Sequence, residues 1–458
     1  MRPLLQCRHR RPLLGLIPRY SRSLVTLAIE TSCDDTGVAV LKHTSKSTEL
    51  LFNERISSDN RAFKGIHPIV AAKGHSAALA PLVRRALDAL PAAEEGHDTG
   101  SLRHCYAGEV RKQIPDFVSV TRGPGMRSNL GIGLDMAKGL AVAWGVPLVG
   151  VHHMQAHALT PRLARALGMS MGENTSTEES TRGPEFPFLS LLVSGGHTQL
   201  VHSTGLTEHS IVATSGDIAI GNLLDQTARD ILPSEIFDTS EHVMYGRLLE
   251  AFAFPPDTND ITSAYEAVFT PPASRSAEMN PPPTGYDWTV PTPFRQTRKL
   301  AFSFSSIFTH VHDIAASRSS MSLAERRALA QHTMIAAFTH LAGRLCVALD
   351  DKPELRTAKT LVVAGGVASN KFLMHVLQRM LAVRGYGDMQ IVAPPVELCT
   401  DNAAMIAWTG MEMFEAGYES DLNITGIGRW PMDPEVGEGI LGVEGWVRRN
   451  IKGSTTTD

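Results

Sequence analysis

The chain has 458 residues, of which 43% are apolar, enough for two or three domains with cores of their own. No apolar run is long enough to cross a membrane, so we expect a soluble protein without a membrane partner. The five cysteines are scattered and form no CxxC pair, which argues against a disulfide framework and against a zinc ribbon.

Residues 1–23 differ in kind from the rest of the chain, because they contain six arginines and no acidic residue. This composition is typical of a mitochondrial presequence, and the lack of a continuous apolar segment argues against a secretory signal. The alternative is a basic arm that stays attached. Removal of residues 1–23 would leave 37 basic and 47 acidic residues, a net charge of −10. Nucleic acid would then be attracted only by local basic patches.

Two stretches share one pattern. Residues 24–42, LVTLAIETSCDDTGVAVLK, predict a strand, a turn and a second strand, and residues 186–203, FPFLSLLVSGGHTQLVHS, repeat this arrangement. Each hairpin opens one half of the chain, which indicates an internally duplicated α/β protein. The turns either present hydroxyl and N–H groups to a phosphate or only reverse the chain.

Apolar spacing predicts helices within residues 66–90, 128–145, 216–232 and 325–349. Residues 361–381 predict a strand, a Gly-Gly turn and a helix whose N-terminus is free to meet phosphate or ribose. Neither the dinucleotide-binding GxGxxG pattern nor the P-loop pattern is present there. The proline-rich residues 254–294 have no period, so we expect a partly disordered insertion.

The stretch VHHMQAH, residues 151–157, follows an apolar segment that predicts a buried strand, and it begins a segment with helical spacing. A helix here places His153 and His157 on one face and points His152 elsewhere. Two imidazoles on one face can bind a transition metal, although histidines at such a position can also simply cap a helix.

Six motifs occur in a characteristic order and span nearly all of residues 24–431: AIETSCDDTG, TRGPG, VHHMQAH, LLVSGGHTQLV, AGGVASN and CTDNAAMIA. In these motifs the chain resembles the tRNA threonylcarbamoyl-adenosine transferase family, formerly described as O-sialoglycoprotein endopeptidases. The resemblance implies the duplicated actin-like, sugar-kinase-like and Hsp70-like ATPase fold, with two lobes and a cleft between them. The chain then divides into a presequence at 1–23, an N-terminal lobe at 24–185, a C-terminal lobe at 186–431 and a tail at 432–458.

The same resemblance implies one divalent metal ion held by His153, His157 and Asp401. Two imidazole ligands favour zinc or iron over magnesium. The residues implied to contact the nucleotide substrate are Leu192, Val193, Ser194, Gly195, Gly196, Asp225, Gly246 and Asn370. The resemblance assigns no general base.

The implied reaction transfers a threonylcarbamoyl group from threonylcarbamoyl-AMP to the adenosine next to the anticodon of a tRNA, position 37. The tRNAs are those that read codons beginning with adenine. The presequence favours the mitochondrial branch, acting in the matrix, and a homodimer is expected. AMP is a good leaving group and the attacking amine is weak, so the protein must chiefly position and polarise the reactants.

The chain departs from the family pattern at residues 303–308, SFSSIF, where members often read SFSGLK, and at three single residues. Asn222 replaces the acid of a GE pair, Gln226 replaces a lysine, and Ile69 replaces a glutamate. These changes leave open a non-catalytic, nucleotide-binding scaffold. A metalloprotease is disfavoured because the chain lacks HExxH, and a kinase is disfavoured because magnesium prefers carboxylate ligands.

A basic cluster at Arg295, Arg298 and Lys299 follows the proline-rich residues. We consider two interpretations, a local patch that binds tRNA phosphates and an ordinary solvated run of charges.

Overall fold

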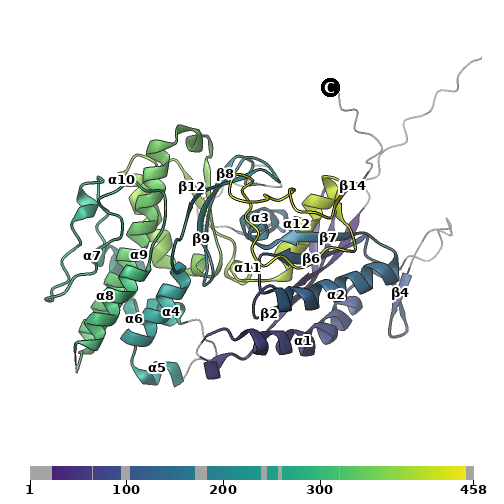
Figure 1. Cartoon of the computed structure of the whole chain (residues 1–458), viewed down its shortest axis with the longest axis horizontal. Coiled ribbons are helices and arrows are strands. Elements are labelled where there is room, and N and C mark those ends of the chain that lie inside the picture. The colour runs from purple at the N-terminus through teal and green to yellow at the C-terminus, as the bar shows by residue number, and fades with distance from the viewer. Residues whose placement is uncertain are drawn as a thin grey trace, which may run out of the picture.

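The computed structural model describes residues 23–449, apart from residue 64 and residues 94–103, 171–182, 239–244, 256–259 and 319. All but the last residue of the predicted presequence therefore lies outside the described residues. The described elements form two lobes, each built on a mixed β-sheet (Figure 1).

The first lobe is built on seven strands: β1 (Leu24–Glu30), β2 (Asp35–His43), β3 (Thr48–Ser57), β6 (Phe117–Gly123), β7 (Leu148–His152), β13 (Tyr418–Ser420) and β14 (Trp446–Arg448). Their order is β14-β13-β7-β6-β1-β2-β3. β1, β2 and β3 are antiparallel neighbours, whereas β1, β6 and β7 run parallel. Along β1, Val25 and Leu27 enter the core on one face of the sheet, and the small Ala28 enters the core on the other.

The second lobe repeats this design with β8 (Phe188–Val193), β9 (Thr198–Ser203), β10 (His209–Thr214), β11 (Thr360–Ala364) and β12 (Gln390–Val392). Their order is β10-β9-β8-β11-β12, with the first three antiparallel and β8, β11 and β12 parallel. The same order and directions relate β3, β2, β1, β6 and β7. This confirms the predicted duplication and the actin-like, sugar-kinase-like ATPase fold class. β4 (His104–Ala107) and β5 (Val110–Gln113) form a separate hairpin.

The larger helices form three layers around the two sheets: α1 (Pro68–Asp88), α2 (Arg127–Trp144), α3 (His153–Ala166), α4 (Ile220–Ile231), α9 (Leu323–Asp351), α10 (Lys371–Val383) and α12 (Ala403–Glu415). α1 and α2 cover one face of the first sheet, and α4, α9 and α10 cover the far face of the second. α3 and α12 lie between the sheets, in a core that joins Val149 and Val151 to Leu192 and Val362. A site on α3 therefore lies where the lobes meet.

The end of the chain returns to the first lobe, which differs from the predicted division at residues 186–431 and 432–458. α12 packs against β1 and β2, and β13 and β14 complete the first sheet. Met432 and Ile440, from the predicted tail, are buried in the core between the sheets. The edge of β7 would otherwise expose unpaired backbone groups, and β13 covers it.

The shorter helices all belong to the second lobe: α5 (Ser234–Asp238), α6 (Gly246–Ala253), α7 (Ile261–Val268), α8 (Ser305–Ala316) and α11 (Val396–Cys399). α7 lies in the proline-rich residues 254–294, where partial disorder was expected. Tyr265, Phe269 and Trp288 from this segment are buried in the second-lobe core, and Glu278 pairs with Arg384. The expectation of disorder is therefore wrong for the described part, which excludes residues 256–259. Burial of three aromatic side chains offsets the entropy of ordering the segment.

α9 is long and apolar enough to cross a membrane by length and composition, contrary to the sequence expectation about apolar runs. Its most apolar window is 94% buried inside the protein, as is common for the central helix of a globular core. α9 packs against α10, α4 and α6. We therefore interpret α9 as the core helix of the second lobe.

Candidate active site

α3 begins directly at the end of β7, and this junction presents the histidine pair. His152 is the N-cap of α3: its Nδ1 accepts a hydrogen bond from the Gln155 N–H, and its Nε2 donates to the Trp430 carbonyl. His153 and His157 follow one turn apart, and both are buried. The predicted geometry is confirmed: His152 has other partners, and the rings of His153 and His157 face the same space.

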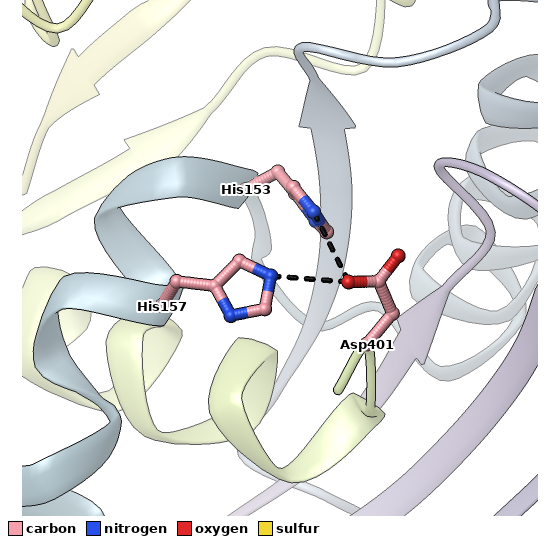
Figure 2. A group of neighbouring side chains, drawn as sticks. All are labelled: His153, His157 and Asp401. Carbon is pink, nitrogen blue, oxygen red and sulfur yellow. Dashed lines mark hydrogen bonds and ion pairs between the residues drawn. The ribbon is translucent and has the colours of Figure 1, made fainter. Parts of the chain in front are cut away.

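Asp401 reaches this space from the other end of the chain. It precedes Asn402, whose side chain caps α12 by accepting a hydrogen bond from the Met405 N–H. α12 packs along α3, so the residue before its cap lies against the histidines. Nε2 of His157 is 3.0 Å and Nε2 of His153 is 3.5 Å from the same Oδ1 of Asp401 (Figure 2).

These three residues fit a metal ion. Their ligand atoms all lie within 4.8 Å of one another. Bonds of about 2.1 Å at tetrahedral angles place ligand atoms about 3.4 Å apart, close to the two distances above. With three protein ligands, a tetrahedral ion would keep a position for a substrate oxygen.

Glu30, at the end of β1, is a member of the site that we did not predict. Its Oε2 is 3.3 Å from Nδ1 of His153, and its side chain also accepts hydrogen bonds from the Ser32 N–H and the Thr121 hydroxyl. A carboxylate behind a metal-binding histidine fixes the ring orientation and the tautomer. In the sequence, Glu30 is an acidic residue at the end of an apolar strand, directly before the hydroxyl-rich turn. This position could have indicated its role.

The charges of the cluster suit a cation. Burial favours the neutral ring of His153, but the carboxylates of Asp401 and Glu30 outweigh it and raise the pKa of His153 to about 10. Burial likewise opposes ionisation of Asp401, but the charge of His153 outweighs it and holds the pKa of Asp401 well below its usual value. The protein thus holds a positive charge between the carboxylates of Glu30 and Asp401, and a metal ion can take the place of the His153 proton.

The turn between β8 and β9 contains the residues that were predicted to contact phosphate. The Ser194 hydroxyl accepts hydrogen bonds from the Gly196 and His197 N–H groups. A Cβ at Gly195 or Gly196 would meet nothing within 4 Å, so the turn faces open space. Leu192 and Val193 are buried, so they can contact a nucleotide only through their backbone.

Gly221 packs against this turn, a contact that the sequence did not predict. The Gly221 N–H donates to the Ser194 carbonyl, and a Cβ at Gly221 would lie 2.7 Å from the Gly195 nitrogen. The first turn of α4 can approach the β8–β9 turn this closely only because residue 221 has no side chain.

His197, also from this turn, lies close enough to the metal-ligand residues to interact with them electrostatically. Burial, followed by the charges of His153 and His157, lowers the pKa of His197 to about 4. The ring is therefore neutral at physiological pH, a second feature of the site that we did not predict.

Asp225 and Gly246 are brought together as the resemblance implied. The Gly246 N–H donates a 2.8 Å hydrogen bond to Oδ1 of Asp225. Burial raises the pKa of the Asp225 carboxyl to about 6, against the opposing effect of this hydrogen bond. The carboxylate remains half-buried and ionised at neutral pH, which suits a sugar hydroxyl as a partner.

Asn370 caps α10, and the N-terminus of this helix is closed, contrary to our expectation. The Asn370 side chain accepts a hydrogen bond from the Leu373 N–H, and Glu250 accepts from the Lys371 and Phe372 N–H groups. A phosphate at this helix end would have to displace a carboxylate. The Gly-Gly turn before Asn370 nevertheless lies beside the β8–β9 turn, since a Cβ at Gly365 would meet the Val193 carbonyl.

The basic cluster offers less free charge than the sequence suggests. Arg298 pairs with Asp351 and Asp350, Arg295 donates to the Met279 carbonyl, and Lys299 lies 5.3 Å from the centre of the Phe294 ring. These contacts favour the interpretation as a structural, solvated run over a dedicated tRNA patch.

Two of the three single-residue departures from the family pattern form one contact. Nε2 of Gln226 donates a 2.9 Å hydrogen bond to Oδ1 of Asn222, one turn away on α4. The acid and lysine of the family pattern would stand at the same spacing, where an ion pair forms. In this chain the two positions therefore form an uncharged contact. Ile69, the third departure, has 62% of its surface exposed on α1.

The fold and this cluster define a two-lobed α/β protein with a candidate metal site of two histidines and one aspartate where the lobes meet. The family model described as TsaD, tRNA N6-adenosine threonylcarbamoyltransferase, matches residues 49–408. The mitochondrial tRNA N6-adenosine threonylcarbamoyltransferase of Schizosaccharomyces pombe is 34% identical over 448 residues, which cover 94% of this chain and 91% of that protein. The Agrobacterium fabrum tRNA N6-adenosine threonylcarbamoyltransferase is 32% identical, over 89% of this chain and 94% of its own.

The chain belongs to the tRNA N6-adenosine threonylcarbamoyltransferase family. Among solved structures, HypF of T. kodakarensis matches 87% of this chain and 48% of its own with a TM-score of 0.38 and 11% identity. The activator of the 2-hydroxyisocaproyl-CoA dehydratase of Clostridium difficile matches 86% and 97%, also with a TM-score of 0.38. Family membership rests on the sequence matches and not on these distant structural similarities.

Proposed function

We propose that this protein transfers the threonylcarbamoyl group from threonylcarbamoyl-AMP to adenosine 37 of tRNAs that read codons beginning with adenine, with a bound metal ion. One observation carries the proposal: His153, His157 and Asp401 converge where the lobes meet, in a chain of this family. A zinc or ferrous ion held there would polarise an oxygen of the donor through its open positions.

The remaining roles follow from the arrangement of the protein groups. The Ser194–Gly196 turn faces open space, and the Ser194 hydroxyl, which accepts hydrogen bonds from two N–H groups of the turn, would donate its own proton to the donor phosphate. Asp225, fixed by Gly246, would accept hydrogen bonds from the ribose. The neutral ring of His197 would hydrogen-bond to the reacting groups without placing a further charge beside the metal ligands.

A non-catalytic scaffold is the weaker alternative. It was kept open by the substitutions at positions 69, 222 and 226, but Asn222 and Gln226 form a hydrogen bond with each other on α4. The metal-ligand residues and the donor turn both keep a usable geometry. A scaffold without catalytic activity would not require the metal-ligand cluster, the donor turn and the α4 contact together.

The protein would act as a homodimer in the mitochondrial matrix. The arginine-rich residues 1–23 support import, and the S. pombe relative is named as mitochondrial. Phe63, Ile66 and Ile69 are exposed at the start of α1 and could pack against a second copy. Sedimentation of the wild type and of Ile69→Glu would test this, because a charged residue in a dimer interface should yield monomers.

The activity is tested with unmodified tRNA, threonylcarbamoyl-AMP and metal-loaded protein, by mass spectrometry of the nucleosides. We expect threonylcarbamoyladenosine at position 37 of a tRNA that reads an adenine-initial codon, and none when guanosine replaces that adenosine. Nucleotide binding without any product would instead favour the scaffold.

A further inference from the structure

Arg55 lies on β3, at the point where the first lobe meets the loop that carries Asp401. Its Nη1 is within hydrogen-bonding distance of three acceptors: Oδ2 of Asp35 at 3.3 Å, the hydroxyl of Thr400, and the main-chain oxygen of Asp401 at 3.4 Å. One guanidinium therefore joins the β1–β2 hairpin to the connection between α11 and α12.

This connection needs an anchor, because it passes from the second lobe to the first while presenting a metal ligand. At the α12 end of the connection, Asn402 caps the helix and donates a hydrogen bond to the Thr400 carbonyl. From β3 of the first lobe, Arg55 contacts the connection at Thr400 and Asp401. All three acceptors lie around the same Nη1, whose two protons they share, and the planar guanidinium fixes the direction of those protons.

The contact leaves the ligand atoms of Asp401 available. Arg55 binds the main-chain oxygen of Asp401, whereas the Asp401 carboxylate points to His153 and His157. The charge of Arg55 is directed at Asp35, whose other oxygen accepts a hydrogen bond from Ser57. Arg55 therefore neutralises a nearby acid without competing for the metal ligand.

We propose that Arg55 is a positioning residue of the metal centre, which places Asp401 for metal binding through its contacts with Thr400 and the Asp401 backbone. The inference rests on the metal site of the proposed function. Arg55 contacts the Thr400 hydroxyl and the main-chain oxygen of Asp401, so its proposed effect on the metal is transmitted through the loop.

The test measures zinc affinity by competition with a chromophoric chelator, together with thermal unfolding without metal. Arg55→Gln should bind zinc about tenfold more weakly, the usual scale for the loss of a group that orients a ligand. Arg55→Lys should be intermediate, because an ammonium keeps the charge and can donate to these acceptors but lacks the fixed planar geometry of a guanidinium. Arg85→Gln is the matched control, since Arg85 forms an exposed ion pair with Glu54 of the same strand. Its zinc affinity should equal that of the wild type.

A second arm uses Thr400→Val. If Arg55 acts through Thr400, the double variant should lose no more zinc affinity than the weaker-binding single variant. Wild-type zinc affinity in folded Arg55→Gln would overturn the proposal, as would an equal loss in Arg85→Gln. Zinc binding by the wild type without tRNA modification would refute the proposed function and leave this inference standing.

Discussion

A carboxylate oxygen of Glu30 lies 3.3 Å from Nδ1 of His153, although 123 positions separate the two residues in the sequence. Glu30 is fully buried, and the Ser32 N–H and the Thr121 hydroxyl hold it in place. It therefore keeps Nε2 of His153 turned toward Asp401. This pair supports the candidate metal site from β1, an interior strand of the first sheet.

Glu30→Gln should weaken metal binding by about 10- to 100-fold, because the amide keeps the shape of the side chain but loses the charge that orients His153. Zinc titration of the apoprotein measures this effect. Circular dichroism would verify that the variant is folded. Unchanged affinity in a folded variant would mean that Glu30 has no role in orienting the ring.

Gly221→Ala should disturb the donor turn from behind. The Cβ added by this substitution would lie 2.7 Å from the backbone of Ser194 and Gly195. The turn would have to shift, so we expect a loss of about 1–3 kcal/mol in the free energy of unfolding and weaker nucleotide binding. Gly195→Ala meets open space, so its unfolding temperature should match the wild type while nucleotide affinity falls. Equal nucleotide affinity in both variants and the wild type would show that this turn does not contact the donor.

Nucleotide binding should weaken below about pH 6. Burial raises the pKa of Asp225 to about 6, so its carboxylate is protonated as the pH falls through that value and accepts ribose hydrogen bonds more weakly without its charge. Affinity should drop by up to about tenfold per pH unit below 6, and Asp225→Asn should remove this dependence. Because the pKa is higher in the folded protein, ionisation costs stability, so Asp225→Asn should stabilise the protein more at pH 8 than at pH 5. An identical pH profile of binding in Asp225→Asn would contradict the assignment.

The hydrogen bond between Asn222 and Gln226 predicts coupled substitutions. Asn222→Glu and Gln226→Lys should each lower activity and stability, since each introduces a charge without its partner on a half-buried face of α4. The double variant should recover most of the loss, because a Glu–Lys pair at this spacing contributes about 0.3–0.5 kcal/mol. Thermal unfolding and the transfer rate, measured on all four proteins, give the coupling. Strictly additive effects would show that the two positions act independently.

Local patterns predicted the duplicated hairpins and the histidine pair, because strand alternation and helical spacing depend on neighbouring residues. Asp401 came from a family motif and not from spacing, since 244 positions separate it from His157. Glu30 and the closure of α10 by Glu250 were missed, because both depend on contacts between distant segments. The order in residues 254–294 was missed for the same reason: its aromatic residues are buried only once the second-lobe core exists.

The central claim is that the cluster of His153, His157 and Asp401 supports threonylcarbamoyl transfer. The most direct measurement is the amount of threonylcarbamoyladenosine formed on unmodified tRNA by the wild type, by His153→Ala and by His157→Ala, each with its bound zinc or iron determined in the same sample. We predict that both variants lose bound metal and product together, and that stripped wild-type protein regains product when metal is restored. Wild-type product levels in folded variants that have lost their metal would contradict the account.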